Sequence, residues 1–189
     1  MAPKTALVIL SGGAEEMETV ITVDVLRRGG IEVTLAGLTG KAPVTCSRKI
    51  VIEPEVALSD VATKLYDVVV LPGGLQGSEA LATSPEVGKI LHTHYEKQSI
   101  VAAICAAPKA LKTHSIAPGC LVTSHPCVKD LLIDAGYKYT EEKVAVSGKV
   151  VTSRGPGTTF DFALKLVELL VGPEKVKEVV GPMMWSHET

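Results

Sequence analysis

Short runs of apolar, often β-branched residues alternate along the chain with segments in which apolar residues recur at helical spacing. The apolar runs carry almost no polar alternation, which is typical of strands that are buried on both faces. Strands that alternate with helices predict an α/β protein with a mostly parallel sheet and helices on both faces. The predicted strands are residues 4–10, 31–37, 67–71 and 99–104, and the clearest predicted helices are residues 14–29, 157–171 and 173–180.

Two further segments have the pattern of antiparallel hairpins. Residues 44–53 carry Ser47 and Arg48 near their middle, and residues 143–153 turn at Ser147 and Gly148. We therefore expect a sheet that is mixed at its edges. The length of 189 residues predicts one domain over residues 1–189, without repeats or a linker.

The apolar residues of the first predicted helix spread over more of its circumference than a one-sided amphipathic helix allows. One side must face the sheet. The other side is expected to face a second copy of the chain in a homodimer, with charged residues pairing across a two-fold axis; the alternative is coverage by the terminal helix of the same chain. The predicted interface residues are Met17, Val20, Ile21, Asp24, Arg27 and Arg28.

Composition excludes several classes of function. With 46% hydrophobic and 21% charged residues the chain is too apolar to be disordered as a whole. A formal net charge of -2 without a basic stripe, and only two Phe, one Trp and four Tyr, predict no dedicated nucleic-acid site. No apolar run reaches the roughly 20 residues of a transmembrane segment, and no secretion signal is visible. These absences predict an intracellular protein; the cytoplasm, with the nucleus and the mitochondrion as further compartments, is what the family resemblance given below implies.

The strongest chemical signal lies at Cys105, which follows an apolar strand and precedes Pro108 among small alanines. This pattern predicts a nucleophile elbow, with a strained backbone and alanines in place of the usual glycines. A thiol at a helix N-terminus is expected to have a lowered pKa and to be reactive. The alternative is an inert buried cysteine, which is common for this residue type.

Two other side chains are expected to lie near Cys105. Glu18 falls on a flank of the first helix that can face the sheet, where burial would raise its pKa and let it donate or return a proton; a simple capping role is the alternative. Glu15 and Glu16 are interpreted as solvent-exposed partners of the helix dipole. His125 follows a short strand-like segment and is the best candidate base.

Other kinds of site fit the sequence less well. The glycine-rich loop before Glu15 lacks the spacing of a nucleotide site, and its carboxylates would repel a phosphate. Zinc ligation by Cys120, His125 and Cys127 matches no standard spacing and lacks a fourth ligand. A peptidase with a Cys105–His125 pair has no evident acid to orient the histidine, and the His-x-Glu pattern of glutamine amidotransferases is absent.

Five segments, in the same order over essentially the whole chain, resemble the DJ-1/PfpI superfamily. The segments are GAEEMET at 13–19, CSR at 46–48, VVVLPGG at 68–74, AAICAAP at 102–108 and TSRGPGT at 152–158. The resemblance implies a flavodoxin-like, doubly wound α/β sandwich and an obligate homodimer. Glu53 stands where the family usually has a further cysteine, and the tail, residues 183–189 with Trp185 and His187, departs from the family pattern.

The resemblance also implies the roles of individual residues. Cys105 would be the nucleophile and redox-sensing thiol, Glu18 its hydrogen-bonded partner and His125 a supporting histidine. The backbone N–H groups of Gly74 and Ala106 would bind an oxyanion or a cysteine sulfinate. The side chains of Arg28 and Arg48 would add positive charge, from this chain or from the neighbouring subunit.

Two functions of different classes follow from this resemblance. One is a glutathione-independent glyoxalase or deglycase that acts on methylglyoxal, glyoxal or their glycated adducts and needs no metal or other cofactor. The alternative is an oxidative-stress sensor with chaperone-like action on client proteins, which works by oxidation of Cys105 to the sulfinate without turnover. The residues alone do not rank them.

Overall fold

The computed structural model describes residues 2–186. The strands are β1 (Thr5–Leu10), β2 (Glu32–Gly37), β3 (Val44–Thr45), β4 (Val51–Ile52), β5 (Val56–Ala57), β6 (Val68–Leu71), β7 (Ile100–Ile104), β8 (Leu121–Val122), β9 (Lys138–Tyr139), β10 (Val144–Ser147) and β11 (Val150–Ser153). The helices are α1 (Glu16–Arg28), α2 (Leu58–Val61), α3 (Leu75–Thr83), α4 (Pro85–Glu96), α5 (Lys109–Thr113), α6 (Lys129–Asp134), α7 (Thr159–Val171) and α8 (Pro173–Val180), with single 3-10 turns η1 (Pro126–Val128) and η2 (Pro156–Thr158).

Within residues 2–186, seven strands form the central sheet in the order β10-β11-β7-β6-β1-β2-β5. All neighbours are parallel except β10 and β11, which form the predicted antiparallel hairpin at one edge. The second predicted hairpin, β3 with β4, is also present but forms a sheet of its own. The prediction of a mostly parallel sheet with a mixed edge is thus confirmed.

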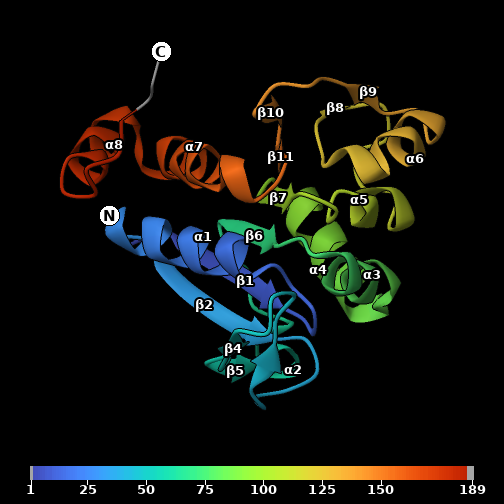
Figure 1. Cartoon of the computed structure of the whole chain (residues 1–189), viewed down its shortest axis with the longest axis horizontal. Coiled ribbons are helices and arrows are strands. Elements are labelled where there is room, and N and C mark those ends of the chain that lie inside the picture. Colours follow the sequence, from blue (N-terminus) through green and yellow to red (C-terminus); the bar gives the residue numbers. More distant parts are fainter. Residues whose placement is uncertain (1, 187–189) are drawn as a thin grey trace.

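Helices cover both faces of the sheet (Figure 1). On one face α1 packs against β1 and β2 and against α7, and α8 packs on α7. On the other face α4 packs against β6 and β7. The strands β6 and β7 are buried throughout and β1 is buried from Ala6 to Leu10, as their uninterrupted apolar sequences predict. The flavodoxin-like α/β arrangement expected from the sequence is therefore confirmed.

The helix α1 leaves one apolar strip open. Val25 and Leu26 are fully buried, whereas Met17 and Val20 are about half exposed. The terminal helix α8 does not provide the alternative cover directly, because it packs on α7, which in turn packs on α1. The homodimer interface stays a prediction, and Ile21, which is partly buried, lies beside the open strip.

The charged residues of this face already have partners in the same chain. Arg28 donates from Nε to Asp24 Oδ2 at 2.9 Å, one turn away in α1, and Arg27 pairs with Glu55. The expected pairing of these residues across a two-fold axis would have to compete with these exposed ion pairs, each of which contributes at most about 1 kcal/mol.

The chain after α8 folds back on the core. Met183 and Trp185 are partly buried against it, and the Trp185 N–H donates to the Val180 carbonyl at 3.2 Å. His187 lies outside the described residues. Within residues 2–186 no helix combines the length and the apolar character that crossing a bilayer requires.

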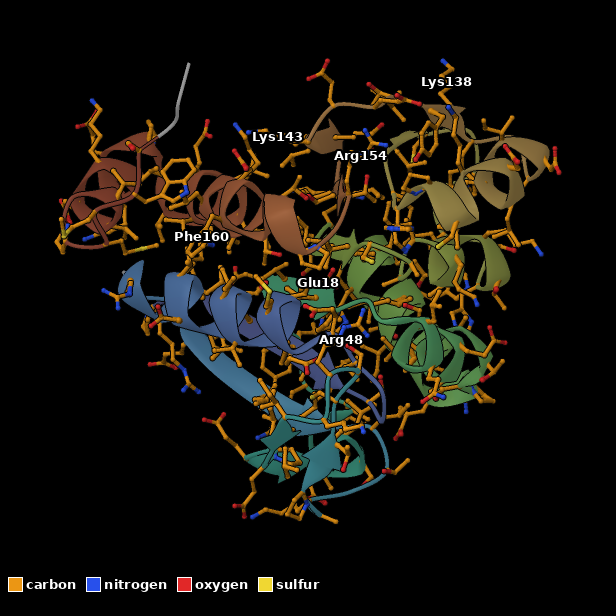
Figure 2. The ribbon with its side chains drawn as sticks, viewed as in Figure 1. Glu18, Arg48, Lys138, Lys143, Arg154 and Phe160 are labelled. Carbon is orange, nitrogen blue, oxygen red and sulfur yellow. The ribbon has the colours of Figure 1, made fainter. Side chains whose placement is uncertain are left out.

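We predict that Phe162→Ala lowers the free energy of unfolding by about 3–5 kcal/mol, because Phe162 on α7 is fully buried and its removal leaves a cavity. The matched control is Phe160→Ala on the same helix (Figure 2), where the ring is only partly buried and a smaller loss is expected. Urea unfolding of both variants measures the difference, and equal losses would contradict this account of the core.

Candidate active site

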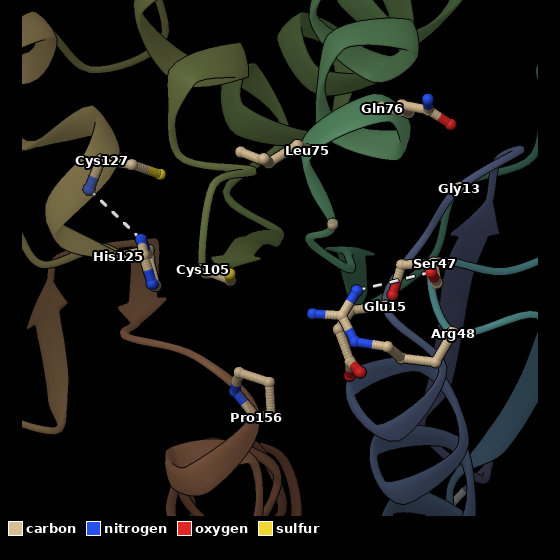
Figure 3. Close-up of a pocket in the computed structure, with 11 residues that line it drawn as sticks. Gly13, Glu15, Ser47, Arg48, Leu75, Gln76, Cys105, His125, Cys127 and Pro156 are labelled. Atoms are coloured by element: carbon tan, nitrogen blue, oxygen red, sulfur yellow. Dashed lines mark hydrogen bonds between the residues drawn. The ribbon is translucent and has the colours of Figure 1, made fainter.

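Three loops meet at the carboxyl ends of neighbouring strands, at the point where the strand order reverses between β1 and β6. They follow β1, β6 and β7, and this edge of a parallel sheet is where ligands bind. The Glu15 N–H donates to the Gly73 carbonyl at 3.0 Å and joins the first two loops. A pocket of about 530 Å³ opens above them (Figure 3). Its lining residues are Gly13, Glu15, Ser47, Arg48, Gly74, Leu75, Gln76, Cys105, His125, Cys127 and Pro156.

Cys105 sits on a sharp turn directly after β7. Its φ of 64° lies in the left-handed region, which costs a non-glycine residue of the order of 1–3 kcal/mol. Hydrogen bonds hold the turn on both sides: the Cys105 N–H donates to the Ser153 carbonyl at 3.0 Å, and the His125 N–H donates to the Cys105 carbonyl at 2.8 Å. The strained elbow predicted from the sequence is confirmed.

Glu18 is fully buried on the inner side of α1 (Figure 2). Its Oε2 accepts a hydrogen bond of 2.6 Å from the Gly73 N–H. Burial raises the pKa of Glu18 to about 7, and the charge of Glu15 acts in the same direction, against the opposing effects of Gly73 and Cys105. The prediction of a buried carboxyl with a raised pKa is therefore confirmed, and its acid–base change falls near neutral pH.

The expected lowering of the Cys105 pKa is wrong. Burial, followed by the charge of Glu18, raises the pKa of the thiol to about 12, while the backbone N–H groups of Gly74 and Ala106 act in the opposite direction. A helix dipole gives little help, because α5 begins only at Lys109 and is five residues long. The sequence pattern correctly predicted the turn, but it overestimated how much the following helix lowers the pKa of the thiol.

The two acids are coupled, because the repulsion that Glu18 exerts on the thiolate exists only while Glu18 is ionised. With a Glu18 pKa of about 7 and a Cys105 pKa of about 12, the pair holds two protons below about pH 7 and one proton between these two values. The thiolate becomes accessible in the state in which Glu18 keeps that proton. Reactivity of Cys105 thus depends on the protonation of its neighbour more than on a helix N-terminus.

The N–H groups of Gly74 and Ala106 both point at the Cys105 sulfur. Gly74 adopts φ 85°, and a Cβ at this position would come within 2.3 Å of the Gly13 carbonyl oxygen, so glycine is required there. Donors in this arrangement stabilise negative charge on the sulfur or on an oxygen bound next to it. The geometry agrees with the oxyanion-binding role that the resemblance implied for these two residues.

His125 lies at the rim of the pocket, exposed, with its ring held by the chain that follows. Its Nδ1 accepts a 3.2 Å hydrogen bond from the Cys127 N–H, so the lone pair of that nitrogen is engaged and the hydrogen of the neutral ring is on Nε2. In this tautomer Nε2 carries the hydrogen and acts as a hydrogen-bond donor. The expectation that His125 acts as a base toward Cys105 is therefore not supported by the hydrogen bonding of the ring.

The two arginines are placed differently. Arg48 lines the pocket opposite His125 (Figure 3), at the tip of the β3–β4 hairpin. Arg28 ends α1, about ten residues or 15 Å from Glu18 along the helix. It does not line the pocket of its own chain. A role for Arg28 in the site would require a second copy of the chain and stays a prediction.

The interpretation of Glu15 and Glu16 as solvent-exposed residues is wrong, because both are buried. Glu15 caps α1 by accepting from the Glu18 N–H at 3.0 Å. Glu16 accepts from the Ser47 hydroxyl at 2.8 Å and from the Arg48 N–H at 2.7 Å. The carboxylate of Glu16 thereby fixes the hairpin that carries Arg48, a contact between distant segments that helix spacing alone could not predict.

Comparison with known proteins agrees with this geometry. Residues 4–169 match the model of the DJ-1/PfpI family. The chain belongs to the DJ-1/PfpI family.

Individual relatives of this DJ-1/PfpI chain cover nearly its whole length. It is 53% identical over 186 residues to the Parkinson disease protein 7 homolog of Danio rerio, covering 97% of this chain and 98% of the relative. It is 44% identical over 183 residues to the glutathione-independent glyoxalase DJR-1.2 of Caenorhabditis elegans, covering 96% and 97%. The crystal structure of Drosophila melanogaster DJ-1beta superposes with a TM-score of 0.96 at 48% identity, covering 98% and 100%.

Within residues 2–186 no three His, Cys, Asp or Glu side chains gather as a metal site would require. Cys120, His125 and Cys127, which zinc ligation would unite, accordingly form no such group.

We predict that Gly73→Ala slows alkylation of Cys105 by about tenfold or more, because the new Cβ would lie 2.5 Å from the Cys105 Cβ and 2.6 Å from Glu18 Oε2. Gly12→Ala is the control, since a Cβ there meets nothing within 4 Å. Iodoacetamide labelling followed by peptide mass spectrometry measures the rate. Equal rates in both variants would show that the close approach at Gly73 does not control the thiol.

We predict that the wild type loses about 3 kcal/mol of unfolding free energy relative to Glu18→Gln as the pH rises from about 4.5 to about 7. In this window the unfolded chain has already released the proton of Glu18 while the folded chain still binds it, so rising pH favours unfolding. Urea unfolding of both proteins across the window measures the difference. If the unfolding free energies of the two proteins changed in parallel with pH, the pKa of Glu18 would be the same in the folded and the unfolded chain.

Proposed function

We propose that this protein is a glutathione-independent glyoxalase and deglycase that converts methylglyoxal, glyoxal or their glycated adducts to α-hydroxy acids. The observation that carries the proposal is the buried Glu18 carboxyl, with a pKa of about 7, beside the Cys105 thiol, which faces the N–H groups of Gly74 and Ala106. The name of the C. elegans relative, a glutathione-independent glyoxalase at 44% identity, supports the same chemistry.

The first step is addition of the Cys105 thiolate to the aldehyde carbon of methylglyoxal, while Glu18 is protonated. A C–S bond forms and the carbonyl π bond breaks, which places negative charge on oxygen. The N–H groups of Gly74 and Ala106 are aimed at this region and stabilise that charge. Transfer of the Glu18 proton to the oxygen completes a hemithioacetal and leaves Glu18 as a carboxylate.

The second step uses Glu18 as a base. Its carboxylate removes the hydrogen from the carbon bound to sulfur and returns a proton to the neighbouring carbon, which moves the oxidation from one carbon to the other. A thioester of lactate results, and water hydrolyses it to lactate and free Cys105. A pKa of about 7 suits a group that must give and take a proton in one cycle. Methylglyoxal and water balance the lactate formed.

The rim of the pocket suits a small dicarbonyl. The Nε2–H of His125 is free to donate to a carbonyl oxygen, and the Arg48 side chain attracts the developing carboxylate from the opposite wall. A pocket of about 530 Å³ that opens to solvent also leaves room for an adduct attached to a longer molecule. These features support both the free aldehyde and the glycated adduct as substrates.

A redox sensor is the second candidate, and the same two N–H groups favour it. Oxidation of Cys105 to the sulfinate would place oxygens where Gly74 and Ala106 donate, and a protonated Glu18 would add a third donor. The oxidised, charged form would then be the state that binds client proteins, and no substrate would be converted.

We predict that Cys105→Ala reduces lactate formation from methylglyoxal to the rate of the aldehyde alone, and that Glu18→Gln lowers kcat by about 10²-fold to 10⁴-fold because the amide cannot carry the proton. Cys120→Ala is the control, since Cys120 lies outside the pocket. Lactate is quantified over time for all three variants and the wild type. Wild-type lactate release no faster than the aldehyde blank would leave only the sensor.

A further inference from the structure

A second thiol, that of Cys127, lines the pocket that holds Cys105, and the proposed reaction does not use it. Cys127 is exposed, whereas Cys46 is buried and Cys120 is partly buried, and neither of these two lines this pocket. In Figure 3 the Cys127 side chain extends from η1 toward the side of the cavity where Leu75 and Cys105 lie. Two sulfurs of different exposure thus face one cavity.

Short hydrogen-bonded steps connect the two cysteines. The His125 N–H donates to the Cys105 carbonyl at 2.8 Å, and the Cys127 N–H donates to His125 Nδ1 at 3.2 Å. Cys127 sits in η1, a single turn whose first two residues, Pro126 and Cys127, are exposed. A disulfide requires Cα atoms within about 7 Å of each other, so the exposed residues of η1 would close on Cys105 while Val128, at the end of the turn, stays in the core.

We propose that Cys127 is the resolving thiol of Cys105, so that the pocket forms a reversible intramolecular disulfide under peroxide. In the first step the Cys105 thiolate attacks one oxygen of hydrogen peroxide; an S–O bond forms, the O–O bond breaks, and water leaves once a proton is added. Cys105 is then a sulfenic acid, oxidised by two electrons. In the second step the Cys127 thiolate attacks the Cys105 sulfur.

This second step forms the S–S bond and breaks the S–O bond. The departing hydroxide takes up the proton that Cys127 lost and leaves as water, so two thiols and one peroxide give one disulfide and two waters. A small-molecule dithiol returns both cysteines to the reduced state by exchange. The cycle therefore needs only a peroxide as oxidant and a thiol as reductant.

The disulfide competes with further oxidation of the same sulfur. Formation of the sulfinate needs a second peroxide, whose arrival depends on its concentration, whereas Cys127 is always present in the pocket. Cys105 is only 9% exposed, so a second peroxide must enter past the rim that Cys127 helps to form. Limiting peroxide therefore favours the disulfide, and excess peroxide favours the sulfinate.

The test uses the full-length protein with limiting hydrogen peroxide, followed by alkylation of free thiols and peptide mass spectrometry without reductant. In the wild type we expect a peptide pair joined through Cys105 and Cys127 in a protein whose intact mass falls by two hydrogens, which dithiothreitol restores. In Cys127→Ser we expect no such pair and about fivefold more sulfinate at Cys105 for the same peroxide. Cys120→Ser, which changes a cysteine outside the pocket, is expected to behave as the wild type.

Three results would overturn the proposal. They are equal sulfinate yields in the wild type and in Cys127→Ser, a disulfide that joins Cys105 to another cysteine, and a Cys105–Cys127 bond found only between two copies of the chain on a non-reducing gel. Cys127 is exposed, so its replacement by serine is expected to leave the fold intact, and far-ultraviolet circular dichroism with the thermal midpoint of the reduced variants checks this.

Discussion

The buried contact between the Glu18 carboxyl and the Cys105 thiol is the constraint on which the chemistry of this protein depends. Burial raises the pKa of both groups, because each is withdrawn from water, and the negative charge of one disfavours ionisation of the other. Above about pH 7 the pair therefore keeps one proton, and the position of that proton decides whether the sulfur or the carboxylate carries the charge. A free surface thiol would have no such dependence on a neighbour.

The fold maintains this contact because the loop after β6 approaches Glu18 and Cys105 through glycine backbone. Gly73 approaches both groups so closely that any Cβ would collide with them, and its N–H holds Glu18 in place. Gly74 takes a left-handed conformation that aims its N–H at the sulfur. The parallel sheet supplies the alignment, since the ends of β1, β6 and β7 reach the same edge. The strain at Cys105 is sustained by hydrogen bonds to Ser153 and His125.

The sequence predicts the parts of the site whose cause is local. The strands, the elbow at Cys105 and the inward face of Glu18 follow from apolar periodicity and from small residues at a turn. The burial of Glu16 could not be predicted in this way, because it depends on a hairpin thirty residues away that supplies Ser47 and Arg48 as partners. The high pKa of Cys105 was also missed, since it reflects desolvation and a neighbouring charge more than the helix N-terminus that the sequence suggested.

In the proposed function, enzymatic turnover and oxidation would draw on the same Cys105 sulfur and would therefore compete for it. Cys105 is 9% exposed, so a reactant must reach it through the pocket, which peroxide, a free dicarbonyl or the reactive end of a glycated adduct would enter. In the proposed cycle the proton transfers of Glu18 and hydrolysis by water release the aldehyde adduct as an α-hydroxy acid, whereas a sulfenic acid returns to the thiol only through another thiol. A second cysteine at the rim would therefore protect the catalytic state of the first, because it offers a reversible route before the sulfinate forms. Burial limits the access of oxidants to the Cys105 sulfur, and a neighbouring thiol would reverse the oxidation that still occurs.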